Sequence, residues 1–307
     1  MTIRFDGRVA IVTGAGGGLG RSHALGLSAR GARLLVNDLG RDGTPPASSL
    51  AVVAEIEKAG GEAIADGADV ANPDEVAAMV ERAEKKWGGV DILVNNAGIL
   101  RDKSFAKMAL SDFEKVLDVH LVGSAICTKA VWPGMRERNY GRIVFTSSAS
   151  GIYGNFGQAN YGAAKAGMIG LMNVLHLEGA KYNIRVNILA PTAATNMTAG
   201  LMAPEMMSLM APETVTPALL YLVSEEGPSR VILGAGAGTF AVTHIVETAG
   251  VYLPEAERTP EMIALRFQEI ADPGTARPLD NAFGQTFKFV NAAATALGVA
   301  LPRQGEK

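Results

Sequence analysis

The sequence predicts an α/β fold in which helices cover both faces of a doubly wound parallel sheet. Short apolar runs rich in β-branched residues alternate with segments of helical periodicity, such as 49–59 and 74–86. This alternation is typical of parallel strands joined by right-handed helical crossovers. The predicted strands span residues 9–12, 33–36, 92–94, 143–146 and 186–189.

The 307 residues, 48% of them hydrophobic, are enough for one large core with an appendage. After about residue 210 the pattern changes to a helix at 212–223, two strands at 231–238 and 240–246, and two helices at 260–271 and 279–297. We therefore expect a main domain over residues 1–253. A C-terminal helical extension over 254–307 would pack on the same domain or on a partner subunit.

Composition excludes several classes of function. The formal net charge of −3 provides no basic field for nucleic acid or an acidic membrane surface. A single cysteine, Cys127, rules out a disulfide framework and a cysteine-rich metal cluster, so no metal is expected. The N-terminal residues lack a signal peptide and no run of 18 apolar residues follows, so we expect a cytoplasmic protein without a membrane anchor.

A glycine-rich turn, TGAGGGLG at residues 13–20, follows the first predicted strand and leads into a helix. Gly14 permits the tight turn, Gly18 lets the backbone approach a pyrophosphate, and Gly20 allows close helix packing. The free amides and the positive dipole at the start of that helix favour an anion. A generic loop could contain the same glycines, but this position predicts dinucleotide contacts from Gly14, Gly18, Leu19 and Gly20.

A carboxylate, Asp38, ends the second predicted strand about twenty residues downstream. It is placed to accept hydrogen bonds from the adenosine ribose, and it would repel the 2′-phosphate of NADP. Gly17 stands where a basic residue could have met that phosphate, whereas Arg41 could still fold back toward it. The sequence therefore favours NAD, with an ordinary turn residue as the alternative interpretation of Asp38.

Two further strand ends are predicted to reach the cofactor. Asp69 and Val70 follow a probable strand and are placed to meet the adenine ring, although Asp69 could instead cap the helix that starts near Pro73. Residues 95–98, NNAG, close another strand with a turn of small residues that would pass under the cofactor. The contacts predicted from this turn are Asn96, Ala97 and Gly98.

Tyr161 and Lys165 lie four residues apart, which places them on one face of a helix. A tyrosine with a pKa of about 10 is a poor base at neutral pH, but an adjacent cation lowers that value. We therefore expect Lys165 to lower the pKa of Tyr161. Ser148 follows the strand predicted at 143–146 and lies thirteen positions before Tyr161, so its hydroxyl could hold a substrate oxygen.

Each of these residues also has a structural explanation. A Tyr and a Lys at this spacing can be an exposed pair on an amphipathic helix, and Ser148 is one member of the turn TSSAS at 146–150. The many Ala and Gly residues around Tyr161 favour instead a helix that a ligand or another helix can approach closely.

The glycine turn, the NNAG tetrad and the Ser148, Tyr161 and Lys165 set together resemble the signature of the short-chain dehydrogenase/reductase family, over about residues 5–240. The resemblance implies a Rossmann fold and an oxidoreductase. It further implies that Tyr161 is the acid/base, that Lys165 also holds the nicotinamide ribose, and that Ser148 orients the substrate.

Two positions depart from the family pattern. Pro191 and Thr195 resemble the segment that positions the nicotinamide, but Thr192 stands where the family has a glycine. His120 stands where the family has an asparagine that supports a water relay to the lysine. The resemblance assigns His120 to the catalytic set, with an ionisation near neutral pH that would tune proton release. A core histidine satisfied by a local hydrogen bond is the alternative.

Three runs of sequence, at 37–40, 118–123 and 148–161, resemble more closely the (3R)-hydroxyacyl-CoA dehydrogenase region of the peroxisomal multifunctional enzymes of type 2. This implies oxidation of a (3R)-3-hydroxyacyl-CoA to the 3-oxoacyl-CoA, with NAD taking the hydride. No hydratase or sterol-carrier region follows, so we expect a free-standing relative. The family also implies a homodimer or homotetramer formed through the helices at 111–138 and 158–181.

Other substrates and other functions stay open at this point. Five methionines between 197 and 210 could line an apolar acyl pocket or only fill an amphipathic helix, and a steroid or another apolar secondary alcohol would fit such a pocket equally well. Arg101, Lys103 and Lys107 could meet CoA phosphates or belong to a solvated loop. Asp38 disfavours an NADP-dependent 3-oxoacyl carrier-protein reductase, and the intact catalytic set disfavours a silent NAD-binding module.

Overall fold

The structure is a computed structural model that describes residues 2–193 and 204–302, without the side chains of 204–206. The chain divides into two compact units, residues 1–243 and 244–307. The division lies ten residues before the predicted boundary at 253/254.

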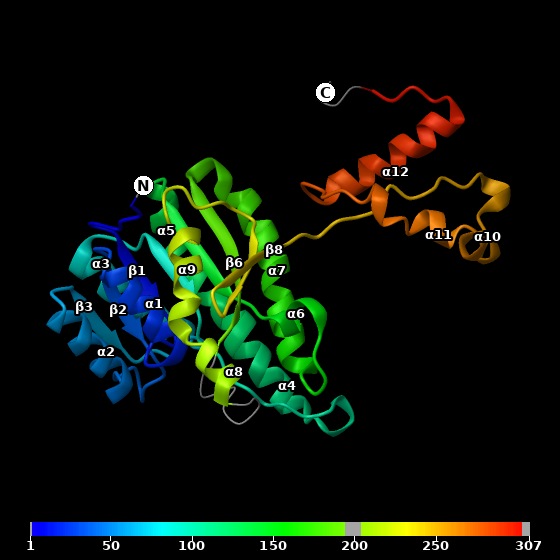
Figure 1. Cartoon of the computed structure of the whole chain (residues 1–307). Coiled ribbons are helices and arrows are strands. Elements are labelled where there is room, and N and C mark those ends of the chain that lie inside the picture. Colours follow the sequence, from blue (N-terminus) through cyan, green and yellow to red (C-terminus); the bar gives the residue numbers. More distant parts are fainter. Residues whose placement is uncertain (1, 194–203, 303–307) are drawn as a thin grey trace. The chain divides into compact units, whose positions relative to one another are not determined.

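The first unit contains one eight-stranded sheet with the order β3-β2-β1-β4-β5-β6-β7-β8 (Figure 1). The strands are β1 Val9–Val12, β2 Arg33–Asn37, β3 Ala63–Asp66, β4 Ile92–Asn95, β5 Gly141–Thr146, β6 Ile184–Thr192, β7 Ile232–Gly236 and β8 Thr239–Thr243. All neighbours pair in parallel except β8, which runs antiparallel to β7. The predicted doubly wound α/β fold is confirmed. Because the strand order reverses between β1 and β4, the carboxyl ends of these strands are the place where a doubly wound sheet generally binds its ligands.

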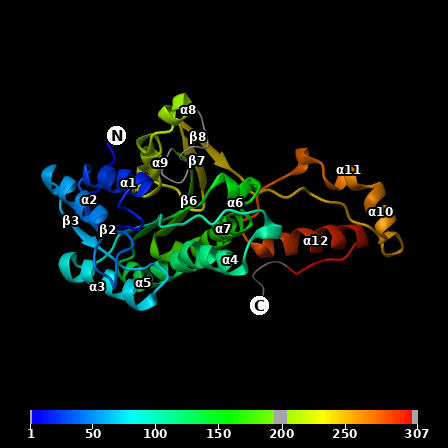
Figure 2. The same cartoon turned by 90° about the horizontal axis from the view of Figure 1, so that it is seen from below.

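Helices cover both faces of this sheet (Figure 2). They are α1 Gly18–Ser28, α2 Ala47–Lys58, α3 Pro73–Trp87, α4 Leu110–Leu117, α5 Gly123–Glu137, α6 Ala149–Tyr153, α7 Ala159–Gly179, α8 Pro204–Leu209 and α9 Thr216–Leu222. Their start signals are local. The side chain of Asn72, for example, accepts hydrogen bonds from the amides of Asp74 and Glu75, and Pro73 occupies the first position of α3.

Two apolar cores form because the side chains of each strand alternate between the faces of the sheet. In β1, Ala10 and Val12 pack with residues of α1, α2 and α9. Val9 and Ile11 pack with residues of α3, α5 and α7 on the other face. The strand ends are thereby held at one edge of the sheet, where the predicted site residues lie.

The predicted helix at 111–138 is not continuous. A π-helical turn, η2, covers Asp118–Val122 between α4 and α5. Such turns are rare in proteins, and those that occur often lie at functional sites. This one buries the side chains of Val119 and His120.

The second unit contains α10 Pro260–Leu265, α11 Phe267–Ile270 and α12 Ala282–Leu297, so the predicted helix at 260–271 divides at Arg266. A bridge between Glu247 and Arg277 and hydrogen bonds from Lys288 to the Glu247 carboxylate and to Thr248 O hold it together. Across residues 2–193 and 204–302, no helix has the length and the apolar character needed to span a bilayer.

Candidate active site

The turn after β1 is tight because glycines occupy two positions of close backbone contact. Gly14 has φ +62°, and a Cβ there would lie 2.8 Å from the Cα of Ala97. A Cβ on Gly20 would lie 2.2 Å from the carbonyl oxygen of Gly14. The structure therefore places Gly14 against the NNAG turn and Gly20 at the start of α1.

The N-terminus of α1 is open to an anion. Its N-cap is Gly17, which has no capping side chain, and a Cβ on Gly17 would meet nothing within 4 Å. Gly18 begins the helix with φ +50°, and Leu19 and Gly20 follow in its first turn. First-turn amides without a side-chain cap suit a phosphate, so the residues present fit a dinucleotide.

Asn96 bonds to the backbone of the glycine turn. Its side-chain amide donates to the carbonyl oxygens of Thr13 (3.0 Å) and Gly14 (3.1 Å). The Thr13 hydroxyl in turn accepts from the backbone amides of Asn96 (3.0 Å) and Ala97 (3.1 Å). The predicted cofactor residues Asn96 and Ala97 thus hold the glycine turn in shape.

Asp38 lies directly beyond β2, beside the glycine turn. Its carboxylate accepts from the amide of Leu39 (2.9 Å) and from the hydroxyl of Ser48 (3.3 Å). A Cβ on Gly16 would come within 2.0 Å of its Oδ2. Among the ion pairs of the described residues none joins Arg41 to Asp38, and Arg41 is exposed.

Val70 is buried, whereas the carboxylate of Asp69 accepts a hydrogen bond from a nearby backbone amide. Val70 is buried in the core against Gly123, where an added Cβ would lie 2.9 Å from Val70 Cγ2. The Asp69 carboxylate accepts from the amide of Ala71 (2.9 Å), while Asn72 provides the cap of α3. The alternative role of Asp69 as that helix cap is therefore wrong, because the cap lies three residues later.

Ser148, Tyr161 and Lys165 converge at the carboxyl end of β5. Ser148 is the N-cap of α6, and its hydroxyl accepts from the amide of Ser150 (3.2 Å). The Ser148 side chain lies close enough to the Tyr161 phenol to lower its pKa, and Lys165 Nζ lies 5.4 Å from the centroid of the Tyr161 ring. The loop through α6 thus brings together two residues that are thirteen positions apart.

Lys165 is held by backbone groups that the sequence interpretation did not single out. Its ammonium donates to the carbonyl oxygen of Thr146, and its own carbonyl oxygen accepts from the hydroxyl of Ser147 (2.8 Å). Thr146 and Ser147 were visible only as members of a turn rich in Ser and Thr. A Cβ on Gly151 would lie 2.6 Å from the Cβ of Lys165, so this glycine lets α6 pack on α7.

The pKa values differ from the sequence expectation. Burial raises the pKa of Tyr161; its hydrogen bond with Ser148 offsets this only in part, and the charge of Asp102 raises it further. Burial also lowers the pKa of Lys165 to about 7. The prediction that Lys165 lowers the pKa of the phenol is therefore wrong for the protein alone, because burial is the largest influence on that pKa and the charge of Lys165 is not among its causes.

His120 is a buried neutral residue. Its side chain is 1% exposed, and burial, with a smaller contribution from the charge of Lys165, lowers its pKa to about 3. Its Nε2 lies 2.8 Å from the carbonyl oxygen and 3.0 Å from the amide nitrogen of Ile99. The expected ionisation near neutral pH is wrong, because the imidazolium would have to form away from water.

The His120 ring also contacts the predicted site residues. It meets the Tyr161 ring edge to face, with centroids 5.2 Å apart. A Cβ on Gly98 would lie 2.2 Å from its Cε1, so Gly98 leaves the space that the imidazole fills. The Ser124 hydroxyl donates to the carbonyl oxygen of His120 (2.5 Å).

Pro191 lies within β6, opposite Ala235 of β7. Thr195, the other predicted nicotinamide contact, lies outside the described residues. Thr192, which replaces the family's glycine, is exposed at the end of β6, where a Cβ on Gly236 would come within 2.7 Å of the Cβ of Thr192. The larger residue on one strand is thus matched by a glycine on the next.

The residues considered as substrate contacts are partly paired with other side chains or partly outside the described residues. Arg101 and Lys103 lie 4.0 and 3.7 Å from carboxylate oxygens of Asp112, which favours the alternative of a solvated loop, and Lys107 is exposed. Met210 is buried and Met207 is half-buried. The side chains of Met197, Met202 and Met206 lie outside the described residues.

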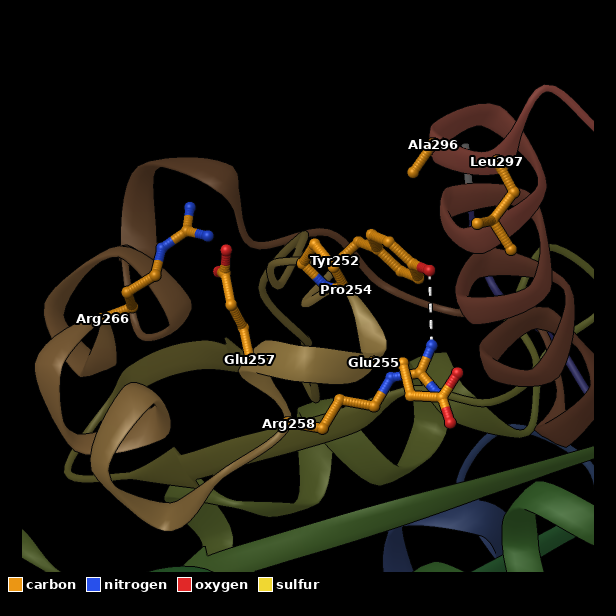
Figure 3. A pocket seen from close by; sticks show the side chains of 8 residues that line it. All are labelled: Tyr252, Pro254, Glu255, Glu257, Arg258, Arg266, Ala296 and Leu297. Carbon is orange, nitrogen blue, oxygen red and sulfur yellow. Dashed lines mark hydrogen bonds between the residues drawn. The ribbon is translucent and has the colours of Figure 1, made fainter.

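The second unit has a pocket of its own, with a volume of 510 Å³ (Figure 3). Tyr252, Glu255, Glu257, Arg258, Arg266 and Leu297 are among the residues that line it. Arg258 donates to the hydroxyl of Tyr252 (3.3 Å), and Arg266 makes an ion pair with Glu269 (2.7 Å). None of the predicted site residues lies in this pocket.

Comparisons with known proteins identify the family of this chain. The family model described as short chain dehydrogenase matches residues 8–205. A short-chain type dehydrogenase/reductase of Mycobacterium tuberculosis is 46% identical over 275 residues, which cover 88% of this chain and 96% of that protein. Peroxisomal multifunctional enzyme type 2 of Drosophila melanogaster is 48% identical over 256 residues, 82% of this chain. This chain spans only 42% of the length of the Drosophila enzyme.

Two solved structures extend the comparison. The full-length Drosophila multifunctional enzyme superposes with a TM-score of 0.81 and 38% identity, covering 96% of this chain and 51% of that one. A 7α-hydroxysteroid dehydrogenase complexed with NADH and 7-oxo glycochenodeoxycholic acid superposes with a TM-score of 0.69 and 30% identity, covering 76% of this chain and 95% of that one. The chain therefore belongs to the short-chain dehydrogenase/reductase family of oxidoreductases, which act on CH–OH groups and generally use NAD or NADP.

Proposed function

We propose that this protein oxidises (3R)-3-hydroxyacyl-CoA to 3-oxoacyl-CoA with NAD. The observation that carries the proposal is the similarity to multifunctional peroxisomal enzymes, which at 48% identity runs through 82% of the chain. It is supported by the convergence of Ser148, Tyr161 and Lys165 at the end of β5.

The three side chains have separate tasks in this proposal. The Ser148 hydroxyl donates a hydrogen bond to the substrate oxygen and so fixes the carbinol beside the phenol. The Tyr161 oxygen, as phenolate, takes the hydroxyl proton as the C–O bond becomes a carbonyl. Lys165 lies 5.4 Å from the Tyr161 ring and, while charged, favours the phenolate. When bound, NAD accepts the hydride from the carbinol carbon, and its positive charge adds to the stabilisation of the phenolate.

Which residues hold the cofactor is part of the proposal. We assign binding of the pyrophosphate to the open N-terminus of α1, at Gly18, Leu19 and Gly20. We assign contact with the nicotinamide half of the cofactor to Gly98. Asp38 is assigned to the adenosine ribose, because its carboxylate lies against the glycine turn and would repel a 2′-phosphate. Asp69, Pro191 and Thr195 remain predicted contacts.

A substrate panel tests the proposal. Formation of NADH is followed at 340 nm with (3R)- and (3S)-3-hydroxyacyl-CoA of several chain lengths, and with 17β- and 7α-hydroxysteroids. We expect turnover of the (3R)-acyl-CoA series alone, with NAD preferred over NADP. The absence of turnover with every acyl-CoA, in a preparation that binds NADH, would overturn the assignment of the substrate.

The hydroxysteroids in the panel represent the second candidate. The similarity to the 7α-hydroxysteroid dehydrogenase, with a TM-score of 0.69, favours it specifically. Steroid turnover without acyl-CoA turnover would select this candidate. A preparation that binds NADH and oxidises no alcohol in the panel would instead support a silent NAD-binding module.

The cofactor preference is tested at Asp38. Replacing Asp38→Ala removes the charge that disfavours NADP, so we expect the preference for NAD to fall by about ten-fold or more, on the order of 1.4 kcal/mol. The ratio of kcat/KM for NAD and NADP measures this. An unchanged ratio would remove Asp38 from the cofactor site.

Assembly and location are also proposals. We propose a homodimer or a homotetramer that uses α4, α5 and α7, and a C-terminal extension that packs on the first unit or on a partner subunit. Light scattering coupled to gel filtration gives the mass, and a monomer at micromolar concentration would contradict the proposed assembly. The predicted cytoplasmic location stays a prediction, since "peroxisomal" in the names of the relatives belongs to those proteins.

A further inference from the structure

Two segments beside the catalytic residues are joined by a set of hydrogen bonds that the mechanism above does not use. We call this set the polar strap; it consists of residues 101–103, after β4, and residues 157–160, where α7 begins. The Lys103 amide donates to Gly157 O (2.9 Å). Gln158 Nε2 donates to Asp102 Oδ2 (2.7 Å), and Asn160 Nδ2 donates to Arg101 O (3.0 Å).

Gln158 connects the polar strap to Ser148. Its Oε1 accepts from the hydroxyl of Ser150 (2.7 Å) and from Nδ2 of Asn155 (3.1 Å). The amide of Ser150 donates to the Ser148 hydroxyl (3.2 Å). A continuous path of short contacts therefore runs from the Asp102 carboxylate through Gln158 and Ser150 to the hydroxyl that holds the substrate oxygen.

Asn160 connects the polar strap to Tyr161. Its side chain is 0% exposed, and its Oδ1 accepts from the Tyr161 amide (2.7 Å) while its Nδ2 is bonded to the 101–103 segment. The carbonyl oxygen of Gln158 accepts from the amide of Gly162 (2.7 Å). The first turn of α7, which carries the phenol, is thereby fixed to the loop after β4.

The charged and titratable groups around the Tyr161 phenol come from three directions. Lys165 lies one turn along the same helix, His120 packs against the ring from the π turn, and Asp102 is the negative charge from the loop after β4. His120 is neutral, since its pKa is about 3. Asp102 therefore acts against the phenolate that Lys165 favours.

We propose that Asp102 and Gln158 are positioning residues for the oxidation, and that they fix the Ser148 hydroxyl and the Tyr161 phenol relative to each other through the polar strap. The inference rests on the proposed role of Tyr161 and does not depend on which alcohol is the substrate. Ser148 is the N-cap of the five-residue helix α6, and the chain between it and Tyr161 runs through this helix and a loop, so its distance from the phenol depends on contacts of this kind.

Two variants separate the geometry from the charge. Gln158→Leu removes all three hydrogen bonds of the side chain, so kcat should fall about ten-fold or more while the Kd for NADH is unchanged. Asp102→Asn keeps an oxygen that can accept from Gln158 but removes the charge. Glu81→Gln, which removes an exposed charge from α3, is the matched control.

The charge variant has a signature in the pH profile. Oxidation needs the phenolate, so kcat/KM rises with pH through the pKa of the phenol. Because the Asp102 carboxylate disfavours the phenolate, Asp102→Asn should lower that pKa and move the rise to lower pH. The Kd for NADH should stay within about two-fold. Glu81→Gln should leave the midpoint where it is.

The experiment uses whichever secondary alcohol the wild-type protein oxidises in the panel, so a wrong substrate assignment leaves it intact. Melting curves and NADH binding establish that each variant is folded. A Gln158→Leu variant that retains the wild-type kcat would overturn the positioning role of Gln158. A midpoint that Asp102→Asn leaves unchanged would overturn the role of the Asp102 charge, whatever happens to Gln158→Leu.

Discussion

The two halves of the sheet edge build their parts of the site in opposite ways. At the β1 side the site depends on glycines, which have no side chain: Cβ atoms on Gly14 and Gly20 would come within 2.8 Å and 2.2 Å of backbone atoms. At the β5 side it depends on polar side chains taken out of water, His120 and Lys165, which are 1% and 2% exposed. The first half is therefore sensitive to added atoms, and the second to changes in charge and hydrogen bonding.

The largest effect is expected at the β5 side. Lys165→Met keeps most of the side-chain volume but removes the ammonium, so kcat should fall by about 100-fold or more. The Kd for NADH should rise as well, because Lys165 is assigned to the nicotinamide ribose. Steady-state kinetics and a fluorescence titration with NADH measure the two effects, and a variant with half of the wild-type kcat would remove Lys165 from the reaction.

The same variant should be more stable than the wild type over a defined range of pH. The pKa of Lys165 is about 7 in the folded protein against 10.5 as the ordinary value, so protonation favours the unfolded chain as pH falls from 10.5 toward 7. The stability advantage of Lys165→Met should therefore grow over that range and then level off, reaching about 1 kcal/mol or more. Urea unfolding at pH 7 and pH 10 measures the difference, and a constant advantage would contradict the burial of a titrating amine.

The next effect is expected at the β1 side. Gly20→Ala places a methyl group 2.2 Å from Gly14 O, so the turn must move, and the Kd for NADH should rise by about ten-fold or more. The matched control is Gly170→Ala, on the exposed part of α7, where a Cβ meets nothing within 4 Å. That control should bind NADH normally and gain about 0.5 to 1 kcal/mol of stability. Normal binding of NADH by Gly20→Ala would argue against a cofactor site at the glycine turn.

A smaller effect is expected where the two halves meet, between Gly98 and His120. Gly98 belongs to the NNAG turn and leaves the space for the His120 ring, so Gly98→Ala alone should cost about 2 kcal/mol of stability. In a His120→Asn background the smaller side chain makes room, and the cost of Gly98→Ala should fall by about 1 kcal/mol or more. Chemical denaturation of the four proteins of this cycle measures the coupling. Additive costs would show that the two positions are independent.

The half built from glycines was the more predictable from sequence. Gly14, Gly18, Gly20 and Asp38 occupy positions that follow from strand ends and spacing, and the structure places the three glycines in the turn after β1 and Asp38 beside that turn. Asn96 and Val70 were interpreted less well, since their hydrogen bonds and burial depend on which neighbours the fold brings near them. A local sequence contains no information on those neighbours.

The half built from polar side chains illustrates this limit more strongly. The spacing of Tyr161 and Lys165 correctly indicates a shared helix face, but the direction of the phenol's pKa depends on burial, which spacing does not report. The partner of His120, the backbone of Ile99, lies 21 positions away and is reached only through a π turn that the helical pattern does not signal. The boundary between the units, at 243/244, likewise follows from packing.

The most direct test of the account is Tyr161→Phe, which removes one oxygen atom from a ring that packs against His120 and lies near Lys165. The account predicts that kcat/KM for the alcohol falls by about 1,000-fold, while the Kd for NADH changes by less than about two-fold. Such a result would place the phenol in the chemical step. A variant that binds NADH normally and retains more than about one tenth of the wild-type kcat/KM would show that another group moves the proton.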